Sequence, residues 1–164
     1  MINDRISELQ ENLKMLYEQR NSLETGALMT PDDEKVMQNQ QKLRFKIRPK
    51  IREYEEELFV VLQQESSGMT FIEADAQAVV DALSEEIVRV QRQPDKYTTQ
   101  MLELLKRIEK TLNEPGVTAD AKLKGTLSMF PPFIGLSYEA QLDTENFCRK
   151  YFPTFTRLIK GAKK

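Results

Sequence analysis

Apolar side chains recur at alternating steps of three and four residues along the first 64 positions. A first helix, expected over residues 2–23, has a stripe in which Arg20 fills one position between Ile2, Ile6, Leu9, Leu13, Leu16 and Leu23. A longer second helix, expected from residue 31 to about residue 64, has a stripe of Val36, Gln40, Leu43, Ile47, Ile51, Tyr54, Leu58 and Val61. Such spacing is typical of helices that pair along a heptad seam. Residues 1–64 are therefore predicted to form a coiled-coil-like antiparallel hairpin.

Two residues modify this hairpin. Gly26 lies in the break between the stripes and is expected to cap the first helix at its C-terminal end. Pro49 falls inside the second helix, where a proline removes one backbone hydrogen bond and crowds the preceding turn. We expect it to kink that long helix without ending it.

Residues 69–164 are predicted to form a compact helical bundle. Helices are expected over residues 70–91, with a capping box between Thr70 and Glu73, over residues 97–112, and from Thr118 to the Pro131–Pro132 pair. Residues 133–138 are predicted to be extended or a loop. A short helix is expected from residue 143 to about 151, followed by a last turn or two that begins at Pro153.

The C-terminal segment is rich in aromatic residues, and two interpretations stay open for it. Of the 13 aromatic residues in the chain, seven lie between Phe130 and Phe155. Clustered aromatic side chains usually build a core. Alternatively, the apolar side chains near the end of the chain dip into an anionic membrane surface beside Arg157, Lys160, Lys163 and Lys164. Pro153 interrupts a continuous membrane-lying face, so the core interpretation is favoured.

The composition excludes several kinds of chemistry. The 164 residues include no histidine, no tryptophan and a single cysteine, Cys148. A Ser-His-Asp or Cys-His nucleophile system, a cysteine–histidine metal cluster and an internal disulfide therefore cannot form. The sequence predicts a protein that is not an enzyme, with no catalytic residue, no cofactor, no metal site and no small-molecule substrate. The acidic, amphipathic N-terminus and the lack of a long apolar run favour a cytoplasmic location.

Charge is unevenly distributed along the chain. Residues 1–117 have a balance of −6 and residues 118–164 a balance of +4. The acidic part argues against broad nucleic-acid binding, whereas the basic C-terminal part leaves it open. The second helix nevertheless carries lysines on one flank of its stripe and arginines on the other: Lys42, Lys46 and Lys50, and Arg44, Arg48 and Arg52. Two cationic flanks suit an acidic partner or a phosphate backbone. The favoured interpretation is a solvated helix that pairs with the acidic run of residues 53–57.

Two parts of the sequence carry a resemblance. The segments ISELQENLKMLYEQRNSLE and KIRPKIREYEEELFVVLQQE in the N-terminal half, and PPFIGLSYE and FPTFTRLIKGAKK in the C-terminal half, resemble the helical effector-associated modules of cyanobacterial conflict and signalling systems. These modules are adaptors linked to STAND-type NTPases and caspase-like peptidases. The resemblance implies an adaptor without catalysis, acting in trans because no effector domain is attached. It implies no particular site residues.

These observations predict an all-α fold: a long kinked antiparallel hairpin over residues 1–64, then a helical bundle over residues 69–164 with an aromatic C-terminal segment. The expected function is a non-catalytic, self-associating interaction adaptor whose partner is itself or a helical protein, either an effector or an NTPase. The alternatives are a membrane-surface module using the C-terminal tail and, less favoured, a nucleic-acid-binding protein. The candidate interaction residues are Leu9, Leu13, Leu16, Leu43, Ile47, Ile51, Leu58, Arg44, Arg48 and Arg52.

Overall fold

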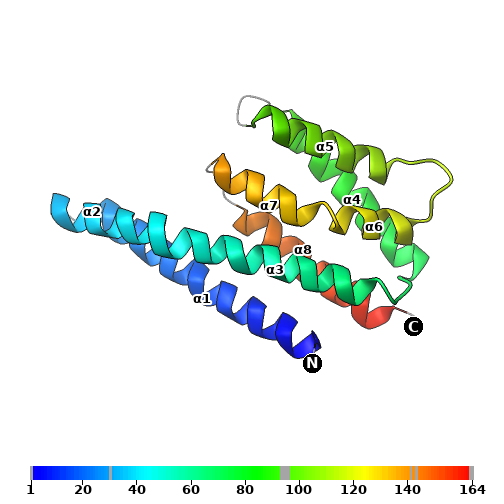
Figure 1. Cartoon of the computed structure of the whole chain (residues 1–164), viewed down its shortest axis with the longest axis horizontal. Coiled ribbons are helices and arrows are strands. Elements are labelled where there is room, and N and C mark those ends of the chain that lie inside the picture. Colours follow the sequence, from blue (N-terminus) through cyan, green and yellow to red (C-terminus); the bar gives the residue numbers. More distant parts are fainter. Residues whose placement is uncertain (1, 30, 93–96, 141, 143, 163–164) are drawn as a thin grey trace. The chain divides into compact units, whose positions relative to one another are not determined.

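The ordered elements of the chain are helices, which confirms the predicted all-α class (Figure 1). The computed structural model describes residues 2–29, 31–92, 97–140, 142 and 144–162. The chain divides into two compact units, Met1–Leu58 and Phe59–Lys164, which we call the N-terminal and C-terminal units. This division falls inside a helix, between Leu58 and Phe59, whereas the sequence predicts it between residues 64 and 69. Over the described residues, no helix is both long enough and apolar enough to span a bilayer.

The N-terminal unit is built from α1 (Ile2–Met29) and a second helix that begins with α2 (Asp33–Lys42). The second helix continues through a π-helical turn, η1 (Leu43–Ile47), into α3 (Arg48–Ser66). Ion pairs join Arg5 to Glu57 at 2.5 Å and Glu24 to Arg48 at 3.6 Å. Later residues of α1 thus meet earlier residues of the second helix, as in an antiparallel pair (Figure 1).

The prediction that Gly26 caps the first helix is wrong, because α1 runs past it to Met29. A Cβ atom added at Gly26 would lie 3.4 Å from Nδ2 of Asn39 on α2. At this distance a side chain at position 26 would make an ordinary contact with Asn39, so space alone does not require glycine here. A glycine inside a helix costs about 1 kcal/mol relative to alanine.

The π turn lies just before Pro49, and two physical effects favour it. The backbone N–H of Arg48 donates to the carbonyl of Leu43, five residues earlier, so the turn is one residue wider than in an α-helix. The wider turn relieves the crowding that Pro49 imposes on the turn before it. It also realigns the inward positions Leu43, Ile47, Ile51 and Glu55, whose steps of four would drift around a regular helix of 3.6 residues per turn. The kink itself stays a prediction.

The predicted apolar stripes of the two helices are mostly buried against each other in the N-terminal unit, with one shift in position on α1. After Leu13, the buried position on α1 is Tyr17, and Leu16 is only half-buried. From Ile6 to Arg20 the buried positions follow at steps of three, four, four and three residues, so two successive steps of four move the buried position from Leu16 to Tyr17. The residues buried in this unit are Ile6, Leu9, Leu13, Tyr17, Arg20, Leu43, Ile51, Glu55 and Leu58.

The C-terminal unit contains α4 (Glu73–Gln91), α5 (Thr99–Leu112), α6 (Ala119–Leu127), α7 (Phe130–Glu139) and α8 (Glu145–Gly161). Helix α4 contacts α5, α6 and α8, and α7 contacts α5 and α6. The helix predicted over residues 97–112 is observed as α5, and its residues Met101, Leu104, Leu105, Ile108 and Leu112 are all buried. The helix start predicted at Thr118 is also observed, and the Thr118 hydroxyl accepts from the backbone N–H of Ala121 at 3.2 Å.

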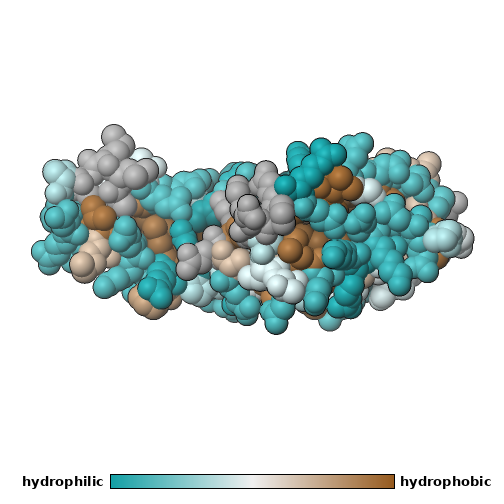
Figure 2. All heavy atoms as spheres, turned by 90° about the horizontal axis from the view of Figure 1, so that it is seen from above, coloured by the Kyte–Doolittle hydropathy of each residue, from teal (hydrophilic) through white to brown (hydrophobic). Residues whose placement is uncertain are grey.

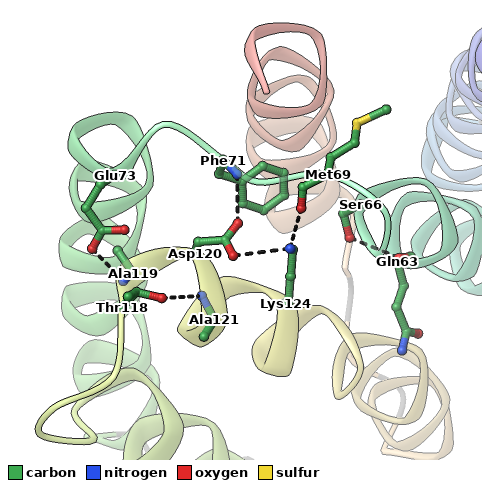
Figure 3. Close-up of polar contacts among 10 residues, drawn as sticks. All are labelled: Gln63, Ser66, Met69, Phe71, Glu73, Thr118, Ala119, Asp120, Ala121 and Lys124. Atoms are coloured by element: carbon green, nitrogen blue, oxygen red, sulfur yellow. Dashed lines mark hydrogen bonds and ion pairs between the residues drawn. The ribbon is translucent and has the colours of Figure 1, made fainter. Parts of the chain in front are cut away.

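The predicted capping box between Thr70 and Glu73 is wrong, because Glu73 caps a different helix (Figure 3). Oε1 of Glu73 accepts from the backbone N–H of Ala119, at the start of α6, at 2.7 Å. In return, Oδ1 of Asp120 on α6 accepts from the backbone N–H of Phe71, just before α4, at 2.7 Å. Lys124 forms an ion pair with Asp120 at 3.1 Å and donates to the carbonyl of Met69. The two helix N-termini thus satisfy each other's backbone donors, which local sequence spacing does not reveal.

Two predictions about prolines are corrected by the structure. Pro131 and Pro132 begin α7, so residues 133–138 are helical instead of extended or a loop. A proline fits the first turn of a helix because no hydrogen bond from its nitrogen is needed there. Pro153 does not divide the final segment, since α8 continues through it to Gly161. Pro153 is exposed, and the buried stripe on the opposite side holds the helix together.

The aromatic residues of the C-terminal segment form the core of the C-terminal unit. Phe130 lies at its centre, with ring centroids 5.0 Å from Phe59, 5.2 Å from Phe147 and 5.9 Å from Phe155. Phe152 stacks 4.5 Å from Phe59 in a tilted arrangement. Tilted and edge-to-face geometries are those that aromatic rings prefer. Helix α8 therefore contributes most of its apolar face to a closed cluster.

Candidate interaction surface

A row of cations on the second helix of the N-terminal unit is the strongest candidate for a functional surface. Three of the six cations between residues 42 and 52 have carboxylate partners: Arg48 with Glu24 at 3.6 Å, Lys50 with Glu53 at 3.8 Å and Arg52 with Glu56 at 3.1 Å. Among the described residues, Lys42, Arg44 and Lys46 have no carboxylate within ion-pair distance. The predicted pairing with the acidic run is observed for Lys50 and Arg52, and Arg48 pairs with the facing helix α1.

Phe45 lies between Arg44 and Lys46, and it was not among the predicted interaction residues. Its side chain is 67% exposed, and the guanidinium carbon of Arg44 lies 5.3 Å from its ring centroid. Met37, two turns earlier on the same helix, is 60% exposed. On the face drawn in Figure 2, hydrophobic residues emerge only as separate patches in a mainly hydrophilic surface. Phe45 could have been recognised from the sequence, because it lies off the apolar stripe between Arg44 and Lys46.

The apolar candidate residues lie mainly in the core. Leu9, Leu13, Leu43, Ile51 and Leu58 are buried, and none is more than 6% exposed. Leu16 and Ile47 are half-buried. The arginines differ from them: Arg44 and Arg48 are exposed and Arg52 is half-buried. Among the candidate residues, the arginines therefore lie at the surface, whereas most of the leucine stripe is buried.

The acidic run of residues 53–57 departs from the predicted solvated face at Glu55. Glu55 is completely buried and accepts a hydrogen bond from the Tyr17 hydroxyl at 2.5 Å. Its neighbours behave as predicted: Glu53 is 66% exposed, and Glu57 pairs with Arg5. This contact with Glu57 raises the pKa of the Arg5 guanidinium, mainly through the hydrogen bond to Glu57. A buried polar contact between Tyr17 and Glu55 serves the packing of α1 on α3.

Other features offer little chemistry. No group of three or more metal-ligating side chains occurs within the described part of the chain. Cys148 is buried in α8. A hollow of about 310 Å³ is lined by Gln100, Glu103, Leu104, Arg107, Ser128, Met129, Pro132 and Leu136. It combines one carboxylate and one guanidinium with apolar walls and holds no arrangement of a nucleophile beside a base.

Tyr151 is the remaining unusual polar group. It is 1% exposed, and its hydroxyl has no hydrogen-bond partner among the residues that the structure describes. Burial raises the pKa of Tyr151 to about 12, and the negative charge of Glu86 adds to this rise. A phenol with so high a pKa is neutral at physiological pH and is a poor base or nucleophile. Tyr151 is thus a core residue with an unsatisfied hydroxyl.

This assignment predicts how Tyr151→Phe changes the pH dependence of stability. The native pKa lies above the usual value of about 10, so the unfolded state ionises first as pH rises. The stabilisation from the neutral phenol is complete below pH 10 and is lost between pH 10 and about 12. Tyr151→Phe should remove this alkaline loss and, by deleting an unsatisfied buried hydroxyl, increase stability at pH 7 by about 1 kcal/mol. Urea unfolding of both proteins across this pH range measures the difference.

The matched control is Tyr54→Phe, which removes the hydroxyl of a half-buried tyrosine in the N-terminal unit. It should leave the alkaline profile of the wild-type chain in place. If Tyr151→Phe loses as much stability as the wild-type chain above pH 10, the neutral buried phenol is not the cause of that loss.

Comparison of the chain with protein-family models, with curated proteins and with solved structures finds no match. The case for function therefore depends on the residues themselves.

Proposed function

We propose that this chain is a non-catalytic protein–protein interaction adaptor that associates with itself in a bacterial signalling or defence assembly. The observation that carries the proposal is the exposed Phe45 beside the unpaired cations Lys42, Arg44 and Lys46. An aromatic residue and arginine are side chains enriched in the centres of protein interfaces. The resemblance to effector-associated modules supports the same function.

The two alternatives have weaker support. A membrane-surface module would use the apolar side chains of the C-terminal tail, yet Tyr151, Phe152, Phe155, Leu158 and Ile159 are buried. Lys163 and Lys164, two of the cations expected to help the tail, lie outside the described residues. A nucleic-acid-binding surface would need a longer positive track, but carboxylates begin at Glu53, directly after the cations.

The proposal predicts that the purified chain forms a dimer or a larger assembly at micromolar concentration. Light scattering coupled to gel filtration should give a mass of at least twice the 19.1 kDa of one chain. The mass should fall towards that of one chain on dilution, because association depends on concentration. A mass of 19.1 kDa at every concentration up to tens of micromolar, with no partner added, would contradict self-association.

A further inference from the structure

Along one flank of the second helix, three cations are followed by two carboxylates. Lys42, Lys46, Lys50, Glu53 and Glu57 follow one another at steps of four, four, three and four residues. On a helix such steps place side chains in one row, and the π turn keeps the row aligned across residues 43–47. The first three members are cations and the last two are carboxylates. Phe45 and Pro49 are exposed in the neighbouring row.

From this row we infer that the second helix binds the same helix of a second copy of this chain, antiparallel, about a two-fold axis near Pro49 and Lys50. The inference rests on the proposed self-association and names its surface. A two-fold axis reverses the order of residues, so the cationic end of one copy faces the acidic end of the other. Lys46 then lies opposite Glu53 of the second copy, and Lys42 opposite its Glu57. Each pair occurs twice in the dimer.

The exposed groups suit this contact. Lys42 and Lys46 have no carboxylate partner among the described residues, and Glu53 is 66% exposed with only a 3.8 Å contact to Lys50. Glu57 already binds Arg5, so the pair of Lys46 and Glu53 contributes the larger share of the attraction. Phe45, at 67% exposure, lies beside the row and supplies apolar area next to the charges.

The same row argues against a phosphate backbone as the occupant. The cations from Lys42 to Lys50 cover eight helical steps, which is about 12 Å. Phosphates follow each other every 3.4 Å along the axis of each DNA strand, so the patch would meet only about four before reaching Glu53 and Glu57. These carboxylates repel a continuing strand but attract the lysines of a second copy.

A charge-exchange experiment tests the inference. Lys46→Glu and Glu53→Lys are made separately in the full chain, and dimerisation is measured by analytical ultracentrifugation for each variant and for an equimolar mixture. Each variant alone places like charges opposite each other twice, so its dimer dissociation constant should rise about tenfold or more. The mixture should recover the wild-type affinity, because both pairs become attractive again. The recovered affinity should fall with added salt, since exposed charges are screened.

Several outcomes separate this inference from the proposed function. Lys110→Glu, an exposed charge reversal in the C-terminal unit, is the matched control and should leave the dimer unchanged. Circular dichroism establishes that each variant is folded. If the wild-type chain dimerises but the mixture shows no recovery, the antiparallel contact is wrong and self-association survives through another surface. If the wild-type chain does not dimerise, both proposals fail. Binding of a DNA duplex that Lys46→Glu abolishes, without dimerisation, would assign the cations to nucleic acid instead.

Discussion

Phe155→Ala should destabilise the C-terminal unit by about 3–5 kcal/mol, the usual cost of removing a buried phenylalanine side chain. Phe155 is completely buried, and its ring meets Phe130 edge-to-face at 5.9 Å. The substitution removes this contact and leaves a cavity that the surrounding rings fill only in part. Domains typically have total stabilities of about 5–15 kcal/mol, so much of the folded population should be lost. Urea unfolding followed by circular dichroism measures the change.

Phe45→Ala is the matched control for this experiment when both variants are measured at a dilution at which the chain is monomeric, because it makes the same substitution at a side chain that is 67% exposed. Its cost should stay within about 0.5 kcal/mol. Equal costs at the two positions would contradict the aromatic core described for α8.

The same core bears on the membrane alternative. If the tail inserts into lipid, deletion of residues 143–164 should leave a folded remainder that no longer binds anionic vesicles. If the tail is a core element, the deletion should unfold the C-terminal unit, because it removes Tyr151, Phe152 and Phe155 together. Circular dichroism of the truncated chain and vesicle sedimentation of the full chain distinguish these results. A folded truncation with salt-sensitive vesicle binding by the full chain would favour the membrane-surface module.

Apolar periodicity predicted the fold class because burial of one helix face is a property of each segment by itself. The stripe of α5, the end of that helix after Leu112 and the cap at Thr118 all follow from residues within a few positions of each other. Arg20 was also placed correctly at a seam position, which the structure shows to be 6% exposed. The extension of α1 past Gly26 to Met29 was not predicted, because glycine is a common residue at helix C-termini.

The features that were not predicted depend on residues far away in the sequence or on the side of the helix on which a residue lies. Glu73 lies three residues after Thr70, as a capping box requires, but its partner is Ala119 on another helix. Pro153 is a helix breaker by local propensity, yet the packing of α8 overrides it. Phe45 carries the candidate surface because it lies outside the stripe. An exposed aromatic residue among cations is visible in the sequence only once the inward positions are known.

Tyr17→Phe should cost the N-terminal unit about 3 kcal/mol, although it removes only one oxygen atom. The Tyr17 hydroxyl donates to Oε2 of Glu55 at 2.5 Å, and both side chains are buried. A buried acceptor that loses its hydrogen-bond donor costs about 1–3 kcal/mol. Tyr54→Phe, which alters a half-buried tyrosine on α3, should cost less than about 1 kcal/mol. Urea unfolding of the two variants gives the comparison.

A double-mutant cycle identifies the contact itself as the cause. Glu55→Gln removes the charge and keeps the size of the side chain, so its cost alone should resemble that of Tyr17→Phe. If the two side chains act through their shared hydrogen bond, the double variant should cost at least about 1 kcal/mol less than the sum of the single variants. Additive costs would mean that Tyr17 and Glu55 stabilise the unit independently. A non-additive result would instead show that the buried side chains of Tyr17 and Glu55 couple α1 to α3.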